Sequence, residues 1–171
     1  AYDVALTGST VAITNDTNFL NTGTTTLGNA TADTLTFTGG LGATAGAVNA
    51  AGTINTTNQQ MDLGAVTVTT TGQTLTLDTG TGAGALNVAS ITGVAGGAAE
   101  NITLISGAGA TTVSGNIGTD IGTLTLQENA ASSTGAVALQ GNVTAATLTT
   151  FARAYDVALT GSTVAITNDT N

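Results

Sequence analysis

The chain has 171 residues, of which 41% are hydrophobic, 3% are aromatic and only 6% are charged. Ten acidic residues face a single basic one, Arg153, so the formal net charge is −9. Because proteins bind phosphate groups through lysine and arginine, this balance excludes a nucleic-acid-binding protein and disfavours attachment to an anionic membrane surface. No run of apolar residues is long enough to span a membrane as a helix, so no membrane insertion is predicted.

Short runs of alternating or apolar residues follow one another along the whole chain, and glycine and asparagine separate them. Threonine and valine, which are frequent in these runs, form strands well and helices poorly. No segment keeps a period of 3.6 residues over three turns, so an all-β fold is predicted. In chain order the expected strands lie at Val4–Thr7, Thr10–Thr14, Asp33–Thr38, Gly52–Thr56, Ala65–Thr70, Gln73–Leu77, Leu86–Ile91, Asn101–Ile105, Thr111–Val113, Gly122–Leu126, Ala136–Leu139 and Thr147–Thr150.

A recurring pattern of alternating threonine and apolar residues suggests the coils of a β-solenoid. Its leucines are Leu35, Leu75, Leu104, Leu124 and Leu148. They are 40, 29, 20 and 24 residues apart, and Ile54 lies near the middle of the first gap. A β-sandwich, the alternative, has strands about 8–12 residues apart and often turns at Asn-Gly or Asp-Gly, dipeptides that this chain lacks. A parallel β-helix is favoured, with about seven coils of roughly 22 residues over residues 1–153 and a rise on the order of 34 Å.

The end of the chain repeats its beginning. Residues 1–18 and residues 154–171 both read AYDVALTGSTVAITNDTN, which defines a unit of 153 residues. Tandem units of this kind are typical of elongated repeat proteins. Residues 1–153 are therefore predicted to form one unit of a continuous solenoid, and residues 154–171 to begin the next. The expected partner is the protein itself, as adjacent units or as chains stacked end to end.

The sequence offers no candidate catalytic, cofactor-binding or metal-binding residue. Without histidine, cysteine or lysine, the usual pairs of nucleophile and base cannot be assembled, so no enzymatic activity and no cofactor are predicted. The acidic residues are isolated, and only Asp16 and Asp33, or Asp62 and Asp78, are about one coil apart. The oxygen-rich segment 15–18 matches no calcium-binding loop and is interpreted as a polar turn.

Pairs of the form Thr-x-Thr recur in the expected strands. Threonines aligned on a flat solenoid face would order water and bind ice, but the irregular spacing between these pairs argues against such an alignment. Outward threonine alternating with inward leucine is the ordinary pattern of any half-buried strand. The threonines are therefore interpreted as structural.

Three stretches resemble the strand repeats of very large bacterial surface proteins, the filamentous-haemagglutinin-like and autotransporter-like adhesins. They are residues 21–29 (NTGTTTLGN), residues 51–56 (AGTINT) and residues 139–143 (LQGNV). The resemblance implies a right-handed parallel β-helix, secretion to the cell surface, and a role as a stalk, fibre or adhesin shaft. The expected function is thus a structural segment of an extracellular bacterial fibre, without catalysis. The alternative is a binding module whose solenoid face recognises a glycan or another surface, with ice less favoured.

Overall fold

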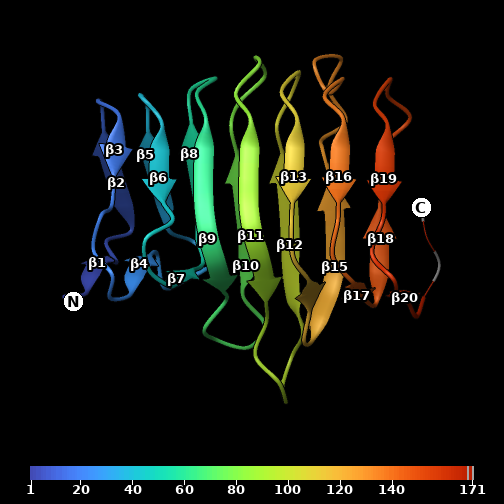
Figure 1. Cartoon of the computed structure of the whole chain (residues 1–171), viewed down its shortest axis with the longest axis horizontal. Coiled ribbons are helices and arrows are strands. Elements are labelled where there is room, and N and C mark those ends of the chain that lie inside the picture. The colour runs from blue at the N-terminus through green and yellow to red at the C-terminus, as the bar shows by residue number, and fades with distance from the viewer. Residues whose placement is uncertain (169, 171) are drawn as a thin grey trace.

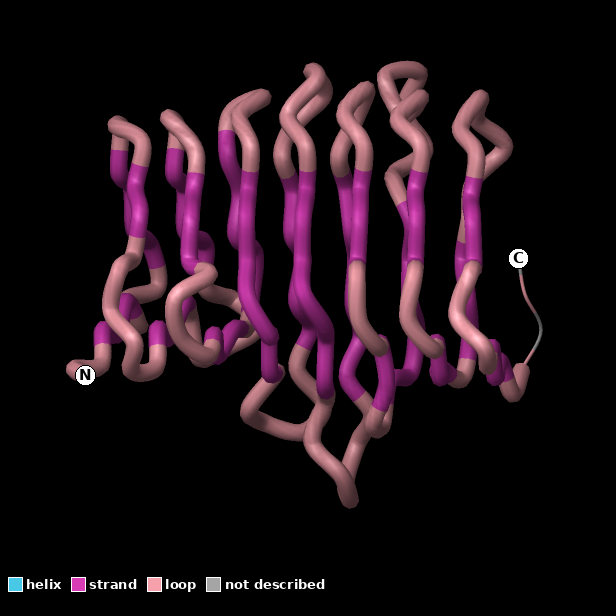
Figure 2. The backbone as a smooth tube through the Cα atoms, in the orientation of Figure 1, coloured by secondary structure: helices cyan, strands magenta, loops and turns pink. Residues whose placement is uncertain are grey.

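The computed structural model describes residues 1–168 and 170. Within this part of the chain every regular element is a β-strand, and every strand pair is parallel. Figures 1 and 2 show the strands stacked along one axis between the two termini. The predicted β-solenoid is confirmed, and the sandwich is excluded because a sandwich consists of antiparallel sheets.

Each coil contributes strands to three rows, which lie in two sheets. The first row is the seven-stranded sheet, and its strands are β2 (Thr10–Ile13), β5 (Thr34–Phe37), β8 (Gly52–Thr56), β10 (Thr74–Asp78), β12 (Glu100–Ile105), β15 (Ile121–Leu126) and β18 (Thr147–Thr149). Seven strands in this row mean seven coils. The predicted number of coils is therefore confirmed.

The second and third rows together form the thirteen-stranded sheet, because β9 (Met61–Thr67) and β11 (Leu86–Thr92) each run through both rows. The remaining strands of the second row are β3 (Thr17–Asn18), β6 (Leu41–Ala43), β13 (Thr111–Val113), β16 (Val137–Leu139) and β19 (Val157–Leu159). The remaining strands of the third row are β1 (Val4–Leu6), β4 (Thr25–Leu27), β7 (Val48–Ala50), β14 (Ile117–Gly118), β17 (Val143–Ala145) and β20 (Val164–Ile166).

The chain winds in a right-handed sense. In Figure 1 the near strands run down the page and the far strands run up it, while the chain advances from left to right. This is the hand that parallel crossover connections almost always take, because right-twisted strands pack back onto their sheet in that way.

The core consists of small ladders of apolar side chains that point into the coil at every second position. In the first row one buried ladder contains Leu35, Ile54, Leu77, Leu104 and Leu126. The adjacent ladder contains Leu75, Ile102, Leu124 and Leu148. The leucines that suggested one series of coils therefore belong to two ladders. A fully buried leucine or isoleucine contributes about 1.5–3 kcal/mol, so many thin layers add up to a stable rod.

Coil length varies, while the strands keep their register apart from one shift between Glu100 and Ile102, where β12 pairs with β15. Leu35 and its ladder partner Ile54 are 19 residues apart, whereas Leu77 and Leu104 are 27 apart. The extra residues lie in the loops, and Figure 1 shows that the loops between β9 and β10 and between β11 and β12 project furthest from the lower edge. Loops tolerate insertions because they do not take part in the ladder.

A buried polar side chain closes the corner between the first and second rows in four successive coils. These four residues, the corner ladder, are Thr56, Thr79, Ser106 and Gln127. Each side chain donates a hydrogen bond to a carbonyl oxygen at the end of its own loop: to Gln59 (2.6 Å), Gly84 (2.6 Å), Gly109 (2.6 Å) and Gly135 (3.0 Å), respectively. The corner ladder therefore satisfies backbone acceptors that the tight turn removes from water.

Replacing Thr79 by valine is expected to lower the free energy of unfolding by about 1–3 kcal/mol, because the buried Gly84 carbonyl loses its donor at nearly constant shape. The matched control is Thr76→Val on the outward side of the same strand, where we expect a change within about 0.5 kcal/mol. Urea denaturation followed by circular dichroism measures both values. Equal effects for the two variants would contradict a structural role for the corner ladder.

Candidate functional site

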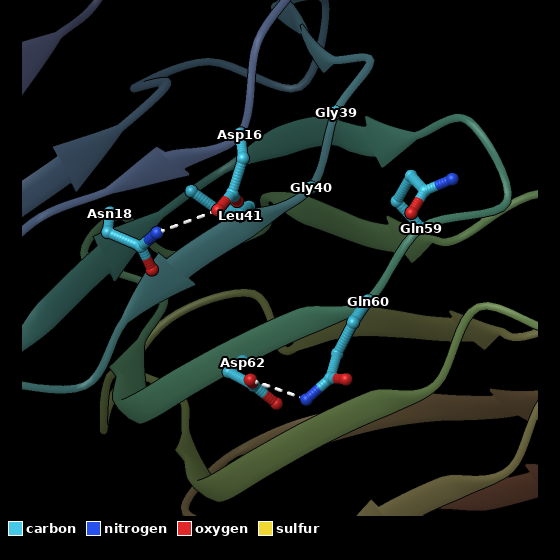
Figure 3. Close-up of a pocket in the computed structure, with 8 residues that line it drawn as sticks. All are labelled: Asp16, Asn18, Gly39, Gly40, Leu41, Gln59, Gln60 and Asp62. Atoms are coloured by element: carbon cyan, nitrogen blue, oxygen red, sulfur yellow. Dashed lines mark hydrogen bonds between the residues drawn. The ribbon is translucent and has the colours of Figure 1, made fainter.

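A polar hollow of about 300 Å³ lies on the outer side of the second row, in the first coils of the solenoid. Figure 3 shows the residues that line it, which are Asp16, Asn18, Gly39, Gly40, Leu41, Gln59, Gln60 and Asp62. Asn18, Gly42 and Asp62 occupy equivalent outward positions on three adjacent strands. Gly42 leaves the space open, since an added Cβ there would overlap the side-chain oxygen of Asn18.

Side-chain amide groups donate hydrogen bonds to both carboxylates of the hollow. The side-chain nitrogen of Asn18 donates a hydrogen bond to Asp16 (3.0 Å), and that of Gln60 donates one to Asp62 (2.6 Å), as Figure 3 shows. Asp62 also accepts a hydrogen bond from Asn87 of the next coil, at 2.8 Å. The hollow is therefore a hydrogen-bonding surface in which each carboxylate already accepts at least one hydrogen bond from the chain.

The acidic residues about one coil apart in sequence do not form stacked pairs in the structure. Asp33 is buried before β5, where it accepts hydrogen bonds from the backbone N–H groups of Asn29 (2.8 Å) and Ala30 (3.1 Å). Asp16 precedes the second row instead. Asp62 lies in the second row and Asp78 in the first. These carboxylates sit in different rows because sequence spacing alone does not fix the row.

Segment 15–18 is held by its own side chains. The Thr17 hydroxyl donates a hydrogen bond to the Asn15 carbonyl oxygen at 3.1 Å, in addition to the bond between Asn18 and Asp16. Such contacts are typical of a turn closed by Asn, Asp and Thr side chains. The predicted turn is limited to Asn15 and Asp16, however, because Thr17 and Asn18 form β3. Across residues 1–168 and 170, no group of three or more His, Cys, Asp or Glu residues gathers in a way that could hold a metal ion.

Glu100 is a fully buried carboxyl group that sequence reasoning did not single out. Its Oε2 accepts a hydrogen bond from the Val94 N–H at 3.2 Å, while Oε1 has no partner within the described part of the chain. Gly93 lies against it, and a Cβ there would overlap Oε2. Because the side chain has no exposed surface, it cannot touch a dissolved substrate. Its hydrogen bond with Val94 holds the loop that precedes β12.

Outward threonines form an unbroken row across the first-row sheet, one in each of the seven coils. The row consists of Thr10, Thr34, Thr53, Thr76, Thr103, Thr125 and Thr149. The expectation that irregular coil spacing would prevent such alignment is wrong, because the loops absorb the variation in length and the strands keep their register. Four of the seven threonines, Thr34, Thr76, Thr125 and Thr149, belong to the Thr-x-Thr pairs that were the sequence signal for this row.

Among the residues that the structure describes, no helix is long and apolar enough to cross a membrane. Comparison with protein-family models, with curated proteins and with solved structures finds no match.

Proposed function

We propose that this chain is a structural, non-enzymatic segment of an extracellular bacterial fibre, stalk or adhesin shaft. The observation that supports this most directly is the location of the repeated segment. Residues 157–159 and 164–166, which begin the second copy of the unit, pair in parallel with β16 and β17 and so extend the same ladder. Each further repeat can stack on the one before it through the same strand pairing, so the chain becomes longer without requiring a new kind of interface.

Rigidity would come from two continuous features of the rod. Backbone hydrogen bonds link every coil to the next through parallel strands, and the apolar ladders fill the interior throughout. Neither feature depends on a ligand. The even spread of few charges keeps such a rod soluble without creating a strong local field.

Electron microscopy of the native material, or of a chain of several units, tests the proposed fibre. We expect long unbranched filaments with an axial rise of about 32 Å for each 153-residue unit, given the spacing of neighbouring strands. The mass of the denatured polypeptide then separates one giant chain from many short chains joined end to end. Compact particles without an axial repeat would overturn the proposal.

The second candidate is a binding module, and the threonine row is the observation that favours it. Threonines in register on a flat sheet present methyl and hydroxyl groups at the spacing of the strands. Ice-crystal shaping and binding to immobilised glycans test this candidate, with Thr76→Lys and Thr103→Lys as variants that interrupt the row. Shaping or binding that both variants abolish, with the solenoid intact, would favour the binding module.

A further inference from the structure

The two copies of the 18-residue segment lie in different rows of the solenoid. Residues 4–6 form a third-row strand, whereas their copies, residues 157–159, form a second-row strand. Residues 10–13 lie in the first row, and the copy of their last three residues, 164–166, lies in the third row. Both strands are displaced in the same direction by one position along the path of the chain.

This displacement follows from the number of strand positions in one unit. Eighteen strands precede residue 157, and β9 and β11 each fill two positions, so one unit fills twenty. Each complete coil has three positions. Because twenty is not a multiple of three, the next copy of the unit must begin one position short of a whole number of coils.

We propose that successive units join as one uninterrupted solenoid in which each unit is rotated by one strand position relative to the unit before it. The partner surface is the open edge formed by β1, β2 and β3, and its occupant is the last coil of a preceding copy of this unit. The inference deepens the proposed fibre function and rests on it. It specifies the register and the rotation of the junction.

The contacts of this junction are present within the chain. Val157 and Leu159 extend the inward ladders of Val137 and Leu139. Val164 extends the ladder of Val143 in the same way. The copies of these residues in the first coil, Val4, Leu6 and Val11, are only partly buried. A preceding unit seated in the same register would therefore cover apolar side chains that the first coil leaves partly exposed.

A tyrosine forms hydrogen bonds across the junction. The hydroxyl of Tyr155 donates a hydrogen bond to the Leu126 carbonyl oxygen (3.0 Å) and accepts one from the Phe151 N–H (2.9 Å). Arg153 beside it donates a hydrogen bond to the Asn129 carbonyl oxygen at 3.1 Å. Tyr2, the copy of Tyr155, is 68% exposed at the other end of the solenoid. Within the described residues, the tyrosine hydroxyl thus forms hydrogen bonds only in the copy that has a preceding coil.

Rotation by one strand position also changes where the threonine row lies on the surface of an array of units. In the second copy, the threonine row begins at Thr163, the copy of Thr10. Thr163 lies beside Asn142 and directly precedes β20, so it belongs to the third row rather than the first. The row therefore moves to another side of the rod in each successive unit. A long array has no single threonine face, which weakens the case for ice binding by the assembled fibre.

Cysteine pairs in the 171-residue chain test the register, since the natural sequence contains no cysteine. Ala138 and Ala158 are outward-facing partners on β16 and β19, so the double variant Ala138→Cys/Ala158→Cys is expected to form a disulfide. If residues 157–159 instead lay in the third row, as their copies 4–6 do, residue 158 would pair with Thr144 on β17. The matched variant is therefore Thr144→Cys/Ala158→Cys, and Thr144→Cys/Ala165→Cys reports the neighbouring pair of β17 and β20.

The readout uses the only basic residue of the chain, which lies at the junction. Trypsin cuts the oxidised, denatured protein after Arg153, and a disulfide keeps residues 154–171 attached to residues 1–153 until it is reduced. We expect attachment for the pairs 138/158 and 144/165 and release for 144/158, in variants whose circular dichroism is unchanged. Attachment through 144/158, or release in all three, would overturn the rotated junction. If electron microscopy shows filaments and the 144/158 pair forms a disulfide, the proposed fibre function is retained and the rotation is excluded.

Discussion

Replacing Leu104 by aspartate is expected to unfold the solenoid. Leu104 is 0% exposed and lies between Leu77 and Leu126 in its ladder. The variant loses the roughly 1.5–3 kcal/mol of a buried leucine and places an unpaired carboxylate in the core, at a cost of several kcal/mol per ion. Domains are commonly stable by only about 5–15 kcal/mol, so the sum removes most or all of the stability.

Thr103→Asp is the matched control for this prediction, because Thr103 is the adjacent residue and points outward. We expect it to change the free energy of unfolding by less than about 1 kcal/mol. Far-UV circular dichroism and urea denaturation of the two purified variants give the comparison. A folded Leu104→Asp variant of near-normal stability would show that the alternation of inward and outward side chains has been assigned incorrectly.

Replacing Gly109 by alanine is expected to destabilise the protein by about 1–3 kcal/mol or more, as overpacking of well-packed sites does. Gly84, Gly109 and Gly135 lie at the same corner of three successive coils, and a Cβ on Gly109 would overlap the carbonyl oxygen of Gly84. Likewise, a Cβ on Gly135 would overlap that of Gly109. Backbone atoms fixed in a strand ladder cannot move aside as a flexible side chain does.

Gly118→Ala is the control for the glycine corner. A Cβ on Gly118 would meet only the Cβ of Thr144, at 3.7 Å, which is an ordinary contact distance. The change is therefore expected to be neutral or slightly stabilising, since alanine restricts the unfolded chain more than glycine does. Thermal denaturation of both variants checks the difference. A neutral Gly109→Ala variant would mean that the coils are further apart at this corner than the structure places them.

The glycine corner and the corner ladder were not anticipated from the sequence, although a signal was present. The segments Gly82-Ala83-Gly84-Ala85-Leu86 and Gly107-Ala108-Gly109-Ala110-Thr111 begin 25 residues apart and precede equivalent strands. Glycine was interpreted, together with asparagine, as a separator of strands. Its second role depends on backbone from the coil below, which no local pattern reveals.

Every strand expected from the sequence coincides with or overlaps a strand of the structure, but several short ones were missed. The missed strands are β3, β4, β6, β7, β14 and β17, while β19 and β20 are the second copies of the expected strands Val4–Thr7 and Thr10–Thr14. Most have only two or three residues and contain few large apolar side chains, so their alternation is too short to recognise. β9 also begins at Met61 and ends at Thr67, whereas the sequence predicted Ala65–Thr70. Pairing with β6 places the start of β9 at Met61, before the residues whose own pattern indicated a strand, while β7 pairs with the end of β9.

The sequence by itself determined the class of fold, the number of coils and, for the strands it predicted, the side that faces the core. These properties depend on local features, namely β-branched residues, a period of two and glycine or asparagine at the turns. The tertiary structure alone decided which row each strand joins. Residues 1–18 and 154–171 are identical, yet their strands lie in different rows, so the row cannot be encoded within the segment. It is set by the number of strand positions already filled and by the coil on which the new strand forms its hydrogen bonds.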